Sequence, residues 1–81
     1  MEREIETMLM MDMQSSTLKW IYKELKRRGC TFEWRGTPFD RKFAVLRENV
    51  ILAEVNDKTD FYRVKVGLIQ AREVLGIPLR S

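Results

Sequence analysis

The chain has 81 residues, of which 44% are hydrophobic and 33% charged, and its net charge is +3. This length and composition are typical of one small globular domain and exclude a disordered chain. The absence of histidine excludes Ser-His-Asp triads, histidine bases and the usual zinc sites, and the single Cys30 cannot form an internal disulfide.

No apolar run approaches the ~20 residues that a membrane-spanning helix needs. The first residues, MEREIETML, are acidic and interrupted by charges, which differs from the pattern of a signal peptide. The lone cysteine fits a reducing compartment. We therefore expect an intracellular, cytoplasmic protein with no membrane association.

Residues 1–28 are expected to be helical, as one bent helix or as two. Apolar residues near helical spacing precede the QSST break, and a second apolar stripe follows it with the spacing i, i+3, i+4, i+7. Gly29 comes directly after the basic run KRR, a combination typical of a helix end. The apolar residues of the two stripes are Ile5, Met8, Leu9 and Met13, then Leu18, Ile21, Tyr22 and Leu25.

A three-stranded sheet is expected over residues 30–55. Cys30, Phe32 and Trp34 alternate with polar residues, which indicates a strand with one buried face. The GTP tripeptide then makes a turn. Residues 42–47 and 50–55 form two further strands joined by a short REN hairpin. Because both are almost continuously apolar, we expect them to lie centrally with both faces covered.

The last predicted helix spans residues 59–76, with Thr59 or Asp60 as its cap and Gly76 at its end. Its buried stripe would contain Phe61, Val64, Leu68, Ala71 and Leu75. Residues 77–81 are long enough for one short terminal strand, in which Pro78 requires an edge position. The prediction is a single α/β domain over residues 1–81 with the order αβββαβ.

Two acidic residues stand out in the apolar part of this sheet. Asp40 lies just before the strand at 42–47, and Glu54 lies inside the strand at 50–55. If a hairpin brings them to the same edge, their oxygens suit a hard divalent cation such as Mg²⁺. A nearby lysine would then stabilise charge on a phosphate and help orient a water molecule.

The segments PFD, ILAEVNDK and RVKVGLIQAREVLGIPLRS resemble the compact PD-(D/E)xK nucleases, in particular the very-short-patch-repair-like endonucleases. The resemblance covers residues 30–81 and implies a restriction-endonuclease-like fold that hydrolyses phosphodiesters with Mg²⁺. It implies that Asp40 and Glu54 are catalytic and bind the metal. Asn56 stands where the family has a lysine or a second acidic residue, so Lys58 would supply the catalytic ammonium group. Phe39 also separates the Pro-Asp pair, and a degenerate, DNA-binding remnant is the other form of this hypothesis.

Basic residues indicate a nucleic-acid partner, with DNA favoured over RNA. Residues 15–36 contain six basic residues against two acidic ones. Three of the basic residues recur at i, i+4 and i+8 on one helix face. Two more directly follow Asp40, and two fall on the polar face of the last helix. The predicted contacts are Lys19, Lys23, Arg27, Arg41, Lys42, Arg63 and Lys65. A homodimer is expected, because the core is small and nucleases that act on duplexes often pair two sites.

Three alternatives remain at the level of sequence. Glu54 is an ordinary surface residue if it pairs across the sheet with Arg47 or Arg41. The αβββα order and GTPFDRKFAV are similar to double-stranded-RNA-binding domains, although few basic residues begin the last helix. The third alternative is a small regulatory protein that dimerises through its Met-rich helix.

Overall fold

The computed structural model describes residues 5, 7 and 16–78 and confirms the order αβββα. Ile5 and Thr7 are helical, and Ile5 is fully buried in the core. Most of the predicted first helical segment and residues 79–81 of the predicted terminal strand lie outside the described residues, and Ile77 and Pro78 are not in a strand. The elements are α2 (Ser16–Arg27), β1 (Cys30–Thr37), β2 (Asp40–Arg47), β3 (Val50–Val55) and α3 (Asp60–Leu75).

The three strands form an antiparallel sheet in the order β1-β2-β3. The hairpin predicted at REN is present, and Glu48 and Asn49 take the left-handed conformation with φ of 53° and 66°. This pair of positive φ angles is typical of the tight two-residue turn that matches the twist of a sheet. The turn predicted at GTP is present but lies later in the chain, because Gly36 and Thr37 belong to β1 and the chain reverses at Pro38 and Phe39.

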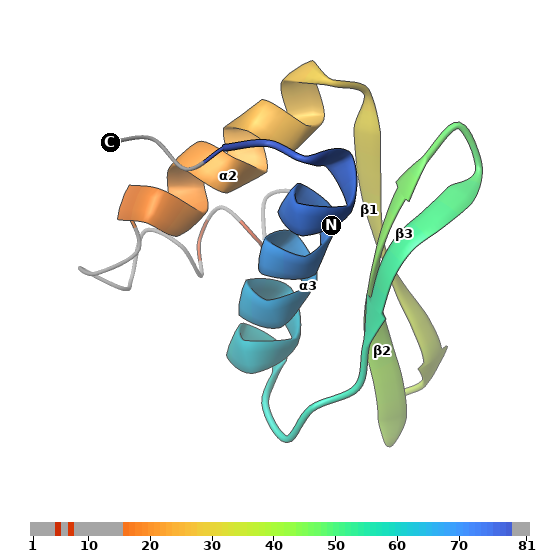
Figure 1. The fold of residues 1–81 in the computed structure, drawn as a ribbon. Helices are drawn as coiled ribbons and strands as arrows, with labels where there is room; N and C mark the ends of the chain where they lie inside the picture. Colours follow the sequence, from red (N-terminus) through yellow and green to blue (C-terminus); the bar gives the residue numbers. More distant parts are fainter. Residues whose placement is uncertain (1–4, 6, 8–15, 79–81) are drawn as a thin grey trace.

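Both helices lie on the same face of the sheet, and the other face is open to solvent (Figure 1). The helix α2 packs against β1, and α3 packs against β2, β3 and α2. The expectation that β2 and β3 are both covered on two faces was therefore wrong. The strand β3 is an edge strand, and its first residues Val50 and Ile51 are 60% and 45% exposed.

The core lies between the helices and the covered face of the sheet, centred on Phe43. A Cβ atom on Gly67 of α3 would lie 2.6 Å from Cδ2 of Phe43, so glycine allows the helix to approach the ring. The predicted bounds of the last helix are confirmed. The hydroxyl of Thr59 accepts the backbone N–H of Tyr62 at 3.2 Å, and Gly76 ends α3 with φ of 69°.

Candidate functional site

The register of the sheet decides on which face each charged residue lies. Ala44 of β2 is opposite Glu33 of β1 and Glu54 of β3. Because side chains alternate along a strand, Asp40 and Lys42 share the face of Ala44, whereas Arg41 shares the face of the buried Phe43. Arg41 and Lys42, which follow Asp40 and were predicted to lie together at one site, therefore lie on opposite faces of the sheet.

A solvent-open hollow of about 350 Å³ lies on the uncovered face, near the β1–β2 turn. Asp40 and Glu54, which the sequence assigns to one site, both line it. The remaining lining residues come from the end of β1 and from β2, and they are Arg35, Gly36, Thr37 and Lys42. The charged part of this lining is balanced, with two basic and two acidic side chains.

Glu54 contacts two basic side chains on the open face. Its carboxylate lies 3.5 Å from Nε of Arg35 and 4.0 Å from Nζ of Lys42. Arg35 also binds Oε1 of Glu33 at 2.8 Å. Glu54 thus pairs with basic residues on neighbouring strands, as the surface alternative expects. Its partners are Arg35 and Lys42 and not Arg47 or Arg41.

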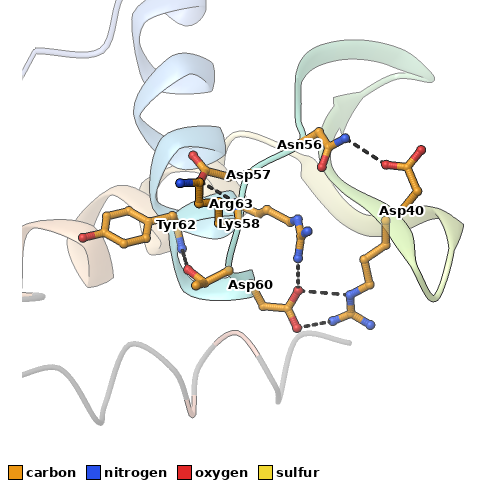
Figure 2. Close-up of polar contacts among 9 residues, drawn as sticks. Asp40, Asn56, Asp57, Lys58, Asp60, Tyr62 and Arg63 are labelled. Atoms are coloured by element: carbon orange, nitrogen blue, oxygen red, sulfur yellow. Dashed lines mark hydrogen bonds and ion pairs between the residues drawn. The ribbon is translucent and has the colours of Figure 1, made fainter.

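Asp40 is held at the end of the β1–β2 hairpin (Figure 2). Nδ2 of Asn56 donates to Oδ1 of Asp40 at 2.9 Å, as Figure 2 shows. The backbone N–H of Asp40 donates to the hydroxyl of Thr37 at 3.1 Å. Gly36 has φ of 90°, and a Cβ atom there would lie 2.4 Å from the carbonyl oxygen of Asp40. The hairpin end therefore needs glycine at position 36, both for its backbone conformation and for this close approach.

The positions of Asp40 and Glu54 do not fit one shared Mg²⁺ ion. Glu54 lies opposite Ala44, which is four positions along β2 from Asp40. At about 3.3 Å per residue, Asp40 and the level of Glu54 are about 13 Å apart along the strand. Mg²⁺ requires its ligand oxygens at roughly 2.1 Å. Lys42 lies between the two acidic residues on the same face and contacts one of them. Among residues 5, 7 and 16–78, no three acidic, cysteine or histidine side chains gather as a metal site.

Arg41 and Arg63 bind Asp60 at the junction between the sheet and α3. Arg41 contacts both carboxylate oxygens of Asp60, at 3.2 and 2.9 Å, and Nη1 of Arg63 donates to Oδ1 at 2.7 Å (Figure 2). The guanidinium of Arg41 also lies over the ring of Trp34, 3.8 Å from its centroid. Arg41 therefore attaches β2 to the start of α3, and Arg63, itself a residue of α3, binds the same carboxylate from within the helix.

The basic row of α2, formed by Lys19, Lys23 and Arg27, is only partly engaged in ion pairs. Arg27 and Arg28 both bind Glu24, and the hydrogen bond from Arg27 is the main reason that the pKa of Glu24 is lowered. Lys23 is exposed and Lys19 is half-exposed. In the described part of the chain, neither lysine lies within ion-pair distance of a carboxylate.

The other predicted basic contacts lie near α3. Nζ of Lys65 is 5.7 Å from the centroid of the Tyr62 ring. Lys58 is exposed, and its backbone N–H donates to Oδ1 of Asp57 at 2.6 Å. Within the described part of the chain, its ammonium group forms no ion pair with Asp40 or Glu54. The predicted catalytic set of Asp40, Glu54 and Lys58 is thus only partly assembled at the hollow.

Sequence reasoning missed the part that Arg35 takes in this site. Its signal was available, because Glu33 and Arg35 are two positions apart in a strand whose alternate residues are apolar. Two such residues must share a face, and Glu54 on the same face follows once the register is known.

Comparison of the chain with protein-family models, with curated proteins and with solved structures gave no significant match. The resemblance to PD-(D/E)xK nucleases therefore rests on the sequence segments alone. Within the described ranges, no helix has the length and apolar character needed to cross a membrane.

Proposed function

We propose that this chain is a nucleic-acid-binding domain that contacts phosphate groups through the basic row of α2. Lys19 and Lys23 lie one helical turn apart on this helix, and in the described part of the chain neither forms an ion pair. The sequence pI of about 9.3 favours a polyanion as partner. That neither lysine has an ion-pair partner among residues 5, 7 and 16–78 is the observation that carries the proposal.

Most other basic residues of the described chain already have carboxylate partners. A phosphate that approached them would have to compete with an existing ion pair, whereas Lys19 and Lys23 bind a phosphate with only counterions to release. The engaged residues are Arg27, Arg28, Arg35, Arg41, Lys42, Arg63 and Arg72.

The test is the salt dependence of binding to a labelled single-stranded DNA oligonucleotide, followed by fluorescence anisotropy. Each phosphate contact on a single strand adds about 0.7 to the slope of log K against log[salt]. We expect the Lys19→Ala, Lys23→Ala double variant to bind more weakly and to lower the slope by ~1.4. Arg47→Ala, which removes one exposed charge from the end of β2, is the matched control and should leave the slope unchanged. A native chain that does not bind, or a double variant with the native slope, would contradict the proposal.

A second candidate, the Mg²⁺-dependent nuclease of PD-(D/E)xK type, has one observation in its favour, while the separation of its two acidic residues along the sheet counts against it. Asp40 and Glu54, fourteen positions apart in the sequence, line the same hollow. Calorimetric titration of Mg²⁺ and Mn²⁺, with an Asp40→Ala, Glu54→Ala variant as control, separates the two candidates. Saturable binding that the variant loses, together with cleavage of linear or branched DNA, would favour the nuclease. The absence of binding favours a domain that binds nucleic acid without cutting it.

The double-stranded-RNA alternative depends on basic residues at the start of α3. There, Arg63 is largely buried and bound to Asp60, which leaves little free positive charge for a duplex. A DNA partner and a homodimer remain predictions. The Met-rich segment expected to form the dimer contact lies outside the described residues, and sedimentation equilibrium would test the oligomeric state.

A further inference from the structure

Phe39 is fully exposed at the turn between β1 and β2. Folding removes none of its surface from water, so the ring contributes nothing to the core. Turn positions usually hold glycine, proline or small polar residues instead of a phenyl ring. Its full exposure makes the turn accessible, and in Figure 1 the turn end of the yellow-green β1–β2 hairpin lies apart from both helices.

The turn that carries Phe39 is fixed on both sides. Thr37 and Asp40, the residues that flank it, are paired across the hairpin and joined by the hydrogen bond from the Asp40 N–H to the Thr37 hydroxyl. Asn56, the residue that directly follows β3, holds the Asp40 carboxylate. The aromatic ring is therefore attached to an ordered support, and little conformational entropy is lost when a ligand stacks on it.

The turn adjoins the hollow, since Thr37 and Asp40 also line it. Arg35, Lys42 and the Thr37 hydroxyl offer donors to this space, and the carboxylates of Asp40 and Glu54 offer acceptors. The two basic and two acidic side chains balance in charge, which suits a neutral polar group better than a phosphate or a metal ion. The volume of about 350 Å³ is at the lower end of the range for small-ligand sites.

A nucleobase matches both parts of this surface. Its edge carries donors and acceptors side by side, and its flat faces stack on aromatic rings. We propose that Phe39 and the hollow form a subsite for an unpaired base of single-stranded nucleic acid, with the ring against a base face and the hollow at a base edge. This inference rests on the proposed nucleic-acid binding and adds that the bound nucleic acid is single-stranded.

The test compares Phe39→Ala with Val74→Ala, which removes an exposed apolar residue from α3, in binding to a single strand containing 2-aminopurine. We expect Phe39→Ala to weaken single-strand binding about fivefold or more and to abolish the change in 2-aminopurine fluorescence that stacking produces. Its salt slope should equal that of the native chain, because no charge is lost. Val74→Ala should behave like the native chain.

The failures of the two proposals are distinguishable. If the native chain binds neither single-stranded nor duplex nucleic acid, both proposals fall, whereas binding to duplex alone overturns only the base subsite. If it binds with a salt slope that depends on Lys19 and Lys23 while Phe39→Ala keeps the native affinity and fluorescence, only the base subsite is overturned. Equal weakening by Phe39→Ala and Val74→Ala would also overturn the subsite, because the loss would then follow exposed apolar area in general. Circular dichroism of each variant checks that it is folded.

Discussion

Arg41 and Lys42 are adjacent on β2 and have opposite surroundings. Arg41 lies on the helix-covered face, contacts both oxygens of Asp60 and stacks on Trp34. Lys42 lies on the open face, and its single ion pair with Glu54 is 4.0 Å long. One position along a strand therefore separates a side chain that attaches a helix to the sheet from one that faces solvent.

The difference between the two faces is mainly one of solvent. A bidentate contact at a half-buried junction is short, directional and poorly screened, whereas an exposed pair gains little over its hydrated ions. The covered face should therefore determine stability. The open face should tolerate substitution and remain available for binding.

The largest expected effect is the replacement of Phe43 by alanine. Its ring is fully buried, with ring centroids 5.3 Å from Trp34 and 6.2 Å from Phe32. We expect Phe43→Ala to lower the free energy of unfolding by about 3–5 kcal/mol, measured by urea denaturation. A loss no larger than that of Ile51→Ala on the edge strand would mean that the covered face is not the main source of stability.

Asp60→Ala should have an intermediate effect. It leaves Arg41 and Arg63 without their carboxylate, and the side chain of Arg63 is only 14% exposed. We expect a loss of about 1–3 kcal/mol in the free energy of unfolding. Asp57→Ala, three positions earlier in an exposed loop, is the control. Equal losses in the two variants would show that the junction contributes no more than a surface contact.

Glu54→Gln should cost less than about 1 kcal/mol of unfolding free energy, because its two ion pairs are exposed. Added salt should shrink the difference between this variant and the native chain. A loss as large as that of Asp60→Ala would remove the contrast between the two faces.

The smallest effect concerns pH and Glu24. The hydrogen bond from Arg27, with a further one from Arg28, lowers the pKa of Glu24 below its ordinary value of 4.5 in the folded chain. The contribution of Glu24 to stability is therefore fully present above the unfolded pKa and is lost as the pH falls through the folded one. We expect Glu24→Gln to reduce the acid dependence of the thermal midpoint, measured from neutral pH downward. An unchanged acid dependence would contradict this linkage.

The order of elements could be predicted because its signals are local. Thr59, Gly76 and the REN hairpin each fix a boundary through their own backbone preferences. The coverage of the sheet could not be predicted, because a continuous apolar run such as VILAEV reads the same in a central strand and at an edge. Its exposed Ile51, opposite Leu46 on the open face, is explained only by the placement of both helices on the other face.

The candidate site was predictable to a similar extent. Asp40 and Glu54, which the sequence assigns to one site, line the same hollow. The sequence could not give the register, and the register places Lys42 between them and Arg41 on the opposite face. Only this pairing distinguishes a cation site from a set of ion pairs.

The most direct test of the account is a ¹⁵N–¹H NMR titration of the labelled chain, first with MgCl₂ and then with a single-stranded DNA oligonucleotide. We expect no saturable Mg²⁺ shifts at Asp40 or Glu54. With DNA, we expect saturable shifts at Lys19, Lys23 and the β1–β2 turn. Saturable Mg²⁺ shifts at both acidic residues, with none on α2 when DNA is added, would contradict it.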